Sequence, residues 1–206
     1  VPAWVGNPRQ DLLDRLANGN GDTPLDYPML THWLNNMNED KVLGMMNYLG
    51  MHNDANDKVN VVFVPCYLTG DDGILNLSYY DVVLANDICV YPSYYEPWGY
   101  TPLEAVAFKV PCITTDLAGF GLWANSVKGS NCSIKDGVEV IHRTDYNYSE
   151  VADAIKDTVV KFASFDDVQV KRSRSNADKL SKKALWSKFI TYYEDAYDFS
   201  LRKAEL

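Results

Sequence analysis

The sequence predicts a Rossmann-like α/β fold, a doubly wound parallel sheet covered by helices, followed by a helical C-terminal extension. Up to residue 148, short apolar runs rich in β-branched residues alternate with helical segments. This alternation is typical of strands buried between two layers of helices. Beyond residue 148 the hydrophobic pattern is helical throughout. The chain has 206 residues, of which 47% are hydrophobic, so it can bury a packed core.

Four strands are expected, because four short segments are mainly apolar and end at proline, glycine or polar residues. They cover residues 59–65, 88–91, 111–115 and 138–141. Two helices are expected beside them, over residues 77–84 and 101–108.

The second of these helices carries a clear start signal. Thr101 is suited to the N-cap, Pro102 to the first helical position, and Glu104 to the first turn. An acidic side chain in the first turn also complements the helix dipole.

In the C-terminal extension, apolar side chains recur at helical spacing and form the buried face of two helices. The first face consists of Val151, Ala154, Ile155, Thr158, Val159 and Phe162, and the second of Leu185, Phe189, Tyr192, Tyr193 and Ala196.

Two N-terminal segments bear on domain organisation. Residues 18–40 are expected to form an irregular, polar excursion from the sheet, and residues 1–5 to be the end of a strand already under way. We therefore expect one α/β domain over residues 1–206, cut from a longer chain; the family resemblance described below further implies that it lacks its first strand–helix unit. Residues 149–206 would be its helical extension. No secretory signal is expected, because no basic segment followed by an apolar stretch opens the chain.

Ligands of such sheets bind beyond the carboxyl ends of the strands, often at helix N-termini. This rule points to two loops, residues 92–101 and 115–121. The segment 92–104 contains three tyrosines, a tryptophan, three prolines and two carboxylates, more than a simple turn requires. The second loop contains Gly119 and Gly121.

The two carboxylates, Glu96 and Glu104, raise the question of glycosidase chemistry, which needs carboxyl groups about 5 to 9.5 Å apart. With Glu96 in the loop and Glu104 one turn into the helix, they are better placed to hold two parts of one extended ligand. A glycosidase is therefore disfavoured.

The sequence YPSYYEPWGYTPLE at residues 91–104, followed by TTDLAGFG at residues 114–121, closely resembles the eukaryotic-type glycogen synthases. These are family-3 retaining glycosyltransferases of the GT-B fold, in which two glutamates at the spacing of Glu96 and Glu104 are a signature. Weaker similarity covers most of the remaining chain.

The resemblance implies a role for each matching residue. Glu96 would be the carboxylate nearest the reacting centre and would contact the donor glucose, which the main-chain amides of Trp98 and Gly99 would also hold. Tyr100 and Thr101 would contact the diphosphate at the helix N-terminus.

On the nucleoside side of the donor, Glu104 would accept hydrogen bonds from the ribose and Tyr79 would stack on the base. Gly119 and Gly121 would lie in a loop near the substrate. Simpler interpretations stay open. The tyrosines could pack in the core, and Tyr80 instead of Tyr79 could face the base. Glu104 could merely complement the helix dipole, Glu96 could lie on the surface, and the two glycines could end a turn.

The resemblance also implies features that this sequence lacks. Related enzymes hold the donor diphosphate with an arginine and a lysine from the first strand–helix unit, and an N-terminal lobe supplies the acceptor side. The arginine cluster that serves glucose-6-phosphate activation is thinner here, at residues 168–175. We therefore expect this chain alone to bind donor weakly and to be inactive.

The distribution of charge narrows the classes of partner that the chain is expected to bind. Residues 1–160 hold 9 Lys/Arg against 21 Asp/Glu, whereas residues 161–206 hold 10 against 7. An acidic body argues against nucleic acid, whose phosphates require clustered cations. The basic run 171–174 is interpreted as a solvated helix face. No apolar run approaches the roughly 20 residues of a membrane-spanning helix.

Cysteine and histidine spacing indicates neither disulfides nor a metal site. Cys66, Cys89, Cys112 and Cys132 show no C-x-x-C pair, and the three histidines share no ligand spacing with them. We expect buried thiols in a reducing compartment, a cytoplasmic location, and no metal or cofactor. The family resemblance likewise implies no metal, because the helix dipole and basic side chains take its place.

Together these observations predict the donor-binding part of a glycogen (starch) synthase. The donor would be a nucleoside-diphosphate glucose, either UDP-glucose or ADP-glucose, and the acceptor an α-1,4-glucan. Expected partners also include the N-terminal lobe of the same chain and a homo-oligomer. Two alternatives stay open: a non-catalytic module that binds nucleotide or glucan, and a related GT-B transferase with another acceptor, such as a sucrose- or trehalose-type synthase.

Overall fold

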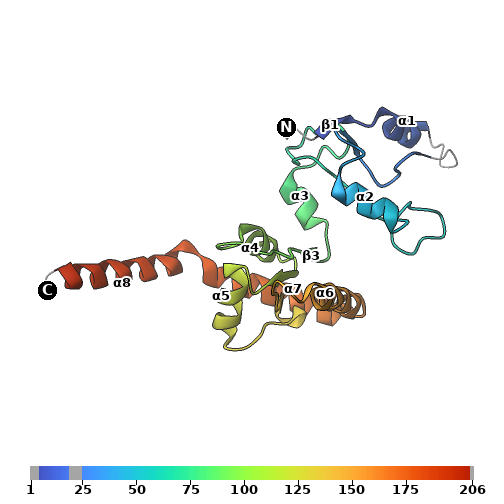
Figure 1. The fold of residues 1–206 in the computed structure, drawn as a ribbon. Coiled ribbons are helices and arrows are strands. Elements are labelled where there is room, and N and C mark those ends of the chain that lie inside the picture. The colour runs from blue at the N-terminus through green and yellow to red at the C-terminus, as the bar shows by residue number, and fades with distance from the viewer. Residues whose placement is uncertain (1–4, 19–24, 205–206) are drawn as a thin grey trace. The chain divides into compact units, whose positions relative to one another are not determined.

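The computed structural model describes residues 5–18 and 25–204, which divide into two compact units (Figure 1). The first unit ends at Val82 and the second begins at Val83. Each unit has its own sheet and its own buried core, and each is described by itself below.

The first unit combines a two-stranded sheet with three helices among its described residues. β1 pairs with β2 in antiparallel orientation, with Val5 opposite Leu34 and Pro8 opposite His32. The strand expected at residues 1–5 is seen from Val5 onward, and residues 1–4 lie outside the described residues. The elements are β1 (Val5–Pro8), α1 (Gln10–Asn18), β2 (His32–Leu34), α2 (Lys41–Tyr48) and α3 (Tyr79–Leu84), of which α3 runs across the division between the units.

The prediction of an irregular, polar segment over residues 18–40 is wrong for the part that follows residue 26. Here Met29, Leu30 and Leu34 form the core of the first unit together with Leu43 of α2. Too few apolar residues stand in a row here to show a period, so the sequence pattern gives no strand or helix signal. Residues 19–24 lie outside the described residues.

A fully buried arginine fixes this segment to the start of α1. The Arg9 guanidinium donates to the carbonyl oxygens of Tyr27 and Leu30 and pairs with the Asp11 carboxylate. Its flat face lies 4.5 Å from the centre of the Trp33 ring. Because each nitrogen of the buried guanidinium donates to an acceptor and Asp11 carries the opposite charge, the charge is compensated within the first unit.

The strand expected at residues 59–65 is not formed. Only Phe63 pairs: its N–H donates to Met29 O, and its carbonyl oxygen accepts from Thr31 N–H. Val59 and Val62 are 74% and 65% exposed, because no partner strand continues beside them within the described part of the chain.

The second unit contains a parallel sheet, and its three described strands confirm three of the expected ones. The strand order is β3-β4-β5, and Cys112 of β4 lies between Cys89 and Val138. All four residues of the central strand β4 are buried, whereas Val90 on the edge strand β3 is 39% exposed instead of buried as expected. The strands are β3 (Cys89–Val90), β4 (Cys112–Thr115) and β5 (Val138–Ile141).

The helix after β3 is confirmed, but its expected start is wrong. α4 (Tyr100–Ala107) has Gly99 at its N-cap with φ 100° instead of Thr101, and Pro102 is its third residue. Glu104 therefore lies in the second turn instead of the first. Glycine adopts this left-handed conformation without Cβ strain, which allows the helix to begin directly after the loop.

The loop expected at residues 117–121 is wrong in its second half. Gly119 is the first residue of α5 (Gly119–Lys128), which ends at Gly129 in the left-handed conformation. Two glycines in three residues disfavour a helix by propensity alone. Close packing requires them at this position, as the site geometry shows below.

The helical C-terminal extension is confirmed, and with it the α/β class of the chain. Val151 of the first helix joins Ile113 and Ile141 of the sheet in one core, while Val159, at the edge of the expected face, is 37% exposed. None of the described residues of the last helix is buried, although an apolar face was expected there, and the helix projects away from the rest of its unit (Figure 1). The elements are α6 (Tyr148–Ala163), α7 (Asp167–Ser181), the 3₁₀ turn η2 (Lys182–Ala184) and α8 (Trp186–Ala204). Among the described residues, no helix combines the length and apolar character needed to cross a bilayer.

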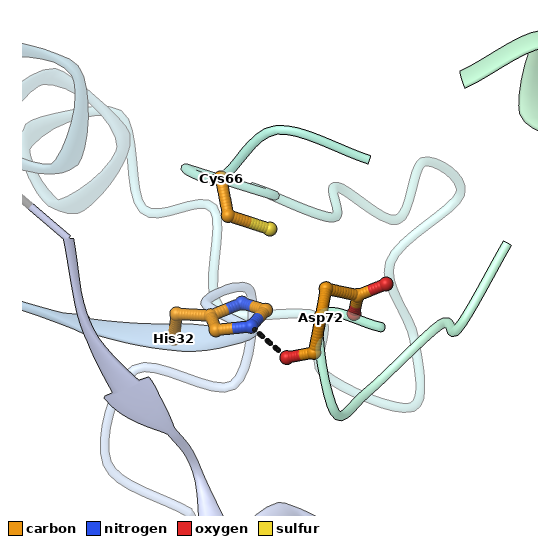
Figure 2. Close-up of side chains that lie close together, drawn as sticks. All are labelled: His32, Cys66 and Asp72. Carbon is orange, nitrogen blue, oxygen red and sulfur yellow. Dashed lines mark hydrogen bonds between the residues drawn. The ribbon is translucent and has the colours of Figure 1, made fainter. Parts of the chain in front are cut away.

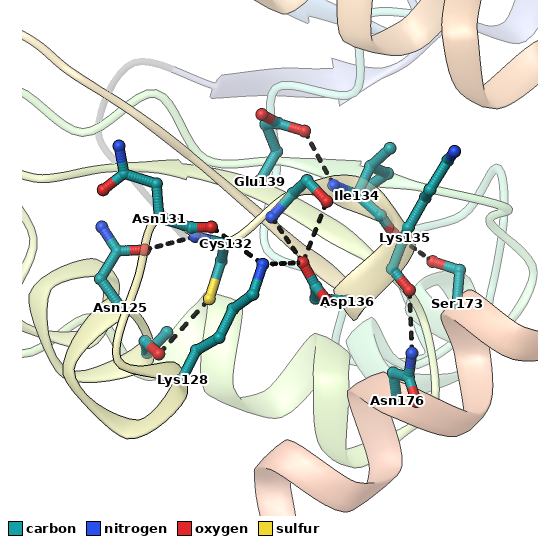
Figure 3. Close-up of polar contacts among 12 residues, drawn as sticks. Asn125, Lys128, Asn131, Cys132, Ile134, Lys135, Asp136, Glu139, Ser173 and Asn176 are labelled. Atoms are coloured by element: carbon teal, nitrogen blue, oxygen red, sulfur yellow. Dashed lines mark hydrogen bonds and ion pairs between the residues drawn. The ribbon is translucent and has the colours of Figure 1, made fainter.

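A polar network around the 3₁₀ turn η1 (Ile134–Asp136) joins α5 and α7 to the sheet (Figure 3). The buried Ser173 hydroxyl of α7 donates to Ile134 O, and Asn176 donates to Lys135 O. At the other end of the turn, the Asp136 carboxylate accepts from the Lys128 ammonium of α5.

Asp136 also closes a capping box with Ser133, accepting from its N–H and its hydroxyl. Burial alone would raise the pKa of the Asp136 carboxyl, but the bonds from Lys128 and Ser133 outweigh burial and hold the pKa below its ordinary value of 3.8. The ionised form is therefore bound more strongly in the folded than in the unfolded chain.

The substitution Asp136→Asn should lower stability in a pH-dependent way. The contribution of a carboxyl with a lowered folded pKa is complete above its unfolded value of 3.8 and is lost as the pH falls through the folded pKa. Urea unfolding should show the variant less stable than the parent at about pH 6, with the difference shrinking toward about pH 3. Asp195→Asn, at an exposed position on α8, should leave the curve unchanged. A pH-independent difference for Asp136→Asn would contradict the assignment.

Candidate functional site

The two loops that the sequence singles out lie side by side at the carboxyl edge of the sheet. Glu96 N–H donates to Leu117 O at 3.2 Å, and Glu96 O accepts from Gly119 N–H at 3.1 Å. The next bond of the series runs from Phe120 N–H to Trp98 O at 2.6 Å. The two segments therefore form a short parallel bridge, and the main chain of Glu96 is held on both sides.

This pairing depends on the absence of side chains at two glycines. A Cβ atom on Gly119 would lie 2.2 Å from Pro97 O, and one on Gly121 would lie 2.3 Å from Thr115 O. Neither oxygen belongs to a flexible side chain that could move aside. Gly119 and Gly121 thus allow α5 to begin directly beside the Glu96 loop. Neither of the two expected roles, a loop near the substrate or the end of a turn, includes this close packing.

Glu96 itself is half-buried, and among the described residues none donates a hydrogen bond to its carboxylate. The carboxylate lies on a main chain that is fixed, next to the N-terminus of α4. This combination leaves an acidic group available for ligand hydroxyl groups, to which it can offer several acceptor sites.

The first turn of α4 begins at Tyr100, separated from Pro97 by Trp98 and Gly99. Tyr100 and Thr101 are exposed, and Gly99 is buried with its main chain turned into the left-handed region. The first N–H groups of a helix lack acceptors within the helix and carry the positive end of its dipole. This geometry fits an anionic ligand at Tyr100 and Thr101. Glu104 lies one turn further and is half-buried.

The Trp98 side chain packs in an aromatic cluster. Its ring lies 5.4 Å from Phe189, 5.7 Å from Trp123 and 6.1 Å from Phe120 between centroids, at angles of 57° to 90°. The expectation that the main-chain amide of Trp98 holds the donor glucose stays a prediction. The cluster borders a groove of about 540 Å³, lined by Trp98, Tyr100, Leu103, Trp123, Ala184, Trp186, Phe189, Tyr192 and Tyr193.

Three polar residues at the same edge were missed by sequence reasoning. Asp116 directly follows β4, and His142 and Arg143 directly follow β5. Asp116 accepts from Arg143 N–H at 2.9 Å, and its other carboxylate oxygen lies 2.6 Å from His142 Nδ1. The Arg143 guanidinium donates to Pro92 O at 2.6 Å, at the end of β3. Applying the carboxyl-end rule to the fourth expected strand would have found His142 and Arg143, whereas Asp116 lies in the loop 115–121 that the rule had already singled out.

Comparison with known proteins agrees with the resemblance that the motif at residues 91–104 suggests. A sequence model of the family described as glycogen synthase matches residues 18–205. This chain belongs to the glycogen synthase family.

The matched relatives are glycogen (starch) synthases of fungi and animals. The chain is 30% identical over 177 residues to isoform 1 of Saccharomyces cerevisiae and to the enzyme of Neurospora crassa, and 27% identical to the liver enzyme of Homo sapiens. Each alignment covers 86% of this chain but 25% of the relative. The chain thus spans about a quarter of the length of the glycogen synthases that it matches.

Tyr79, expected at the nucleotide base, belongs to the first unit, whereas the other expected glycogen synthase site residues belong to the second. Its hydroxyl is buried without a hydrogen-bond partner among the described residues. Its ring contacts Tyr80 edge-on at 5.4 Å, and Tyr80 is 45% exposed. The assignment of base stacking to Tyr79 stays a prediction.

The first unit also gathers three residues of metal-ligand type that no spacing rule had connected. The ligand atoms of His32, Cys66 and Asp72 lie within 4.8 Å of one another (Figure 2). Both imidazole nitrogens already have partners, Thr31 Oγ1 at 2.9 Å and Asp72 O at 2.8 Å. The Asp72 carboxylate accepts from the N–H groups of three residues that follow it, Ile74, Leu75 and Asn76. These groups are committed to the turn, so the cluster is better explained as structural.

The four cysteines are free thiols. Cys112 and Cys132 are buried as expected, whereas Cys66 and Cys89 are partly exposed. Burial raises the pKa of Cys66, Cys89, Cys112 and Cys132, and the charge of Asp72 raises that of Cys66 further. A raised pKa keeps a thiol protonated and unreactive near neutral pH.

The substitution Gly119→Ala should destabilise the second unit. The added methyl group would meet Pro97 O at 2.2 Å, so either the Glu96 loop or α5 must move. Overpacking of this kind costs about 1 to 3 kcal/mol, measurable as a lower urea midpoint. Ser126→Ala, at an exposed position on the same helix, should change stability by less than about 0.5 kcal/mol. An alanine variant at position 119 as stable as the parent would show that the loops do not need this close approach.

Proposed function

We propose that this chain is the donor-binding part of a glycogen synthase that transfers glucose from a nucleoside-diphosphate glucose to an α-1,4-glucan with retention of configuration. The observation that carries the proposal is the fixed Glu96 loop beside the N-terminus of α4. It sets a carboxylate with no protein donor next to a helix end suited to phosphate, so that sugar hydroxyls and a diphosphate can be bound by adjacent groups.

Each part of the donor has a place in this proposal. Glu96 and the main-chain amides of Trp98 and Gly99 hold the glucose, and the aromatic packing of the Trp98 ring keeps that main chain in position. The amides at Tyr100 and Thr101 receive the diphosphate.

The nucleoside is bound further from the loop, by Glu104 at the ribose and Tyr79 at the base. Gly119 and Gly121 support the site from below by allowing α5 to approach. A stacking aromatic ring accepts uracil or adenine, so either nucleotide is compatible with these residues.

The reaction proposed is a front-face displacement. The bond between the anomeric carbon of glucose and the diphosphate oxygen breaks, a bond to the acceptor 4-hydroxyl oxygen forms on the same face, and the hydroxyl proton passes to the departing phosphate. The protein contributes by orienting the two substrates and stabilising charge, and both effects grow when the groups are fixed in advance. In this proposal the acceptor side comes from the rest of the full-length protein, and this chain alone is inactive. The protonated thiols agree with a reducing, cytoplasmic location.

The substitution Glu96→Gln in the full-length gene product tests the proposal. Removing the charge should lower kcat with UDP-glucose or ADP-glucose by about 10²-fold, because the group acts where charge develops in the transition state. Binding of the free nucleoside diphosphate, followed by calorimetry, should change little, since Glu96 faces the sugar.

Glu150→Gln, at an exposed position in the first turn of α6, is the matched control and should keep parental turnover. Parental turnover in Glu96→Gln would overturn the role of Glu96. Absence of transfer by the parental protein with both donors, together with retained nucleotide binding, would favour a non-catalytic module instead.

A further inference from the structure

The carboxyl ends of β3, β4 and β5 are tied together by one arginine and one aspartate. Arg143, which follows β5, donates from its main-chain N–H to the Asp116 carboxylate after β4, at 2.9 Å. Its guanidinium reaches back across the sheet edge to Pro92 O after β3, at 2.6 Å. The same guanidinium lies 5.1 Å from the centre of the Tyr94 ring.

We propose that Arg143 is a positioning residue, which holds the Glu96 loop in the conformation that binds the donor sugar. The proposal rests on the proposed function, because it assigns to Arg143 an effect that is exerted through Glu96. Nothing in the motif at residues 91–104 points to this arginine, which lies 47 residues after Glu96 in the sequence.

The argument starts from how the loop is anchored. Its far end, from Glu96 to Trp98, is bonded to Leu117, Gly119 and Phe120. At its near end, Tyr91 N–H donates to Ile113 O, and Ser93 N–H donates to Tyr91 O, both at 2.8 Å. Two side chains of the described residues also hold it: Arg143 donates to Pro92 O, and the Thr115 hydroxyl donates to Ser93 O at 2.7 Å. Between the anchors lie Tyr94 and Tyr95, which are 52% and 76% exposed and contribute little burial of their own.

Arg143 is suited to this task because its own position is fixed. Asp116 holds the main chain of Arg143 with one carboxylate oxygen and contacts His142 with the other, so the guanidinium projects from a braced segment. A planar guanidinium can donate to a carbonyl oxygen and stack on an aromatic ring at the same time, whereas an ammonium lacks the flat face. Losing both contacts would leave the Thr115 bond to Ser93 O as a side-chain anchor between Pro92 and Glu96, so this stretch would be held less tightly.

A direct role for Arg143 at the donor diphosphate is the competing interpretation, and the two differ in what they do to ligand binding. An arginine that contacts phosphate raises affinity for the free nucleoside diphosphate as well as for the nucleotide sugar. A positioning arginine affects only the sugar and the transfer step, because Glu96 does not contact the nucleotide.

The test compares Arg143→Ala, Arg143→Lys, Glu96→Gln and the Arg143→Ala/Glu96→Gln double variant in the full-length gene product. Arg143→Ala should lower kcat/KM for the nucleotide sugar by about 10- to 100-fold, the scale of a small misplacement of a reacting group. The Kd for free UDP or ADP should stay within about twofold. Arg143→Lys should recover part of the loss, because it can still donate to Pro92 O.

The double variant isolates the coupling. If Arg143 acts through Glu96, adding Arg143→Ala to Glu96→Gln should cost less than about twofold more. Fully additive losses, an equal loss of nucleotide affinity, or parental kinetics in Arg143→Ala would each overturn the proposal. Arg202→Ala, on the exposed face of α8, serves as the matched control and should behave as the parent.

A measurement without turnover separates this proposal from the proposed function. Amide hydrogen exchange should be faster in Arg143→Ala at residues 93–96 and unchanged in β4, whose amides are held by the sheet. If the parental protein proves inactive while exchange rises in this loop, the proposed function fails and the anchoring by Arg143 stands. Unchanged exchange would overturn the anchoring itself.

Discussion

The pairing of the main chain at residues 96–98 with that at residues 117–120 is the constraint on which the candidate site depends. Through it, the loop after β3 and the first turn of α5 become one rigid unit, and Gly119 supplies both a donor to Glu96 O and the space for Pro97 O. A side chain at this glycine would separate the two segments by more than a hydrogen-bond length can accommodate. The orientation of Glu96 therefore follows from main-chain geometry, not from contacts of its own carboxylate.

A second set of contacts extends this rigidity across the sheet edge. β4 is buried at all four positions and lies between β3 and β5, so residues that directly follow it occupy the centre of the edge. Thr115, the last residue of β4, donates to Ser93 O on one side. Asp116, the next residue, accepts from Arg143 N–H on the other. Because the buried strand is rigid, polar side chains at its end hold the neighbouring loop in a fixed position. Binding sites on α/β sheets commonly have this advantage.

The sequence predicted the strands and helices that depend on a local residue pattern. It missed the features that depend on close contact between segments distant in the chain. Three of four strands and the helix around residue 104 follow from apolar runs and a proline near a helix start. The run at residues 59–65 has the same composition, but only Phe63 finds a partner, and composition does not show partners. The start of α5 was interpreted as a loop because glycine disfavours helices, whereas here contact with Pro97 O and Thr115 O decides. The two loops expected at the carboxyl edge of the sheet do lie there, side by side. The contacts of Asp116, His142 and Arg143 were not expected, because their partners are distant in sequence.

The arrangement also bears on how an acidic region would accept the anionic ligand of the proposed function. Residues 1–160 hold 21 acidic against 9 basic side chains, a balance that would repel a diphosphate if all charges acted equally. Exposed carboxylates more than about 8 to 10 Å from the site are largely screened by salt. The N–H groups at the start of α4 act at contact distance and need no counter-charge to be formed. An overall negative charge is therefore compatible with the proposed binding of phosphate at the start of α4. Distant carboxylates are screened by salt, whereas the helix N–H groups would contact the phosphate directly.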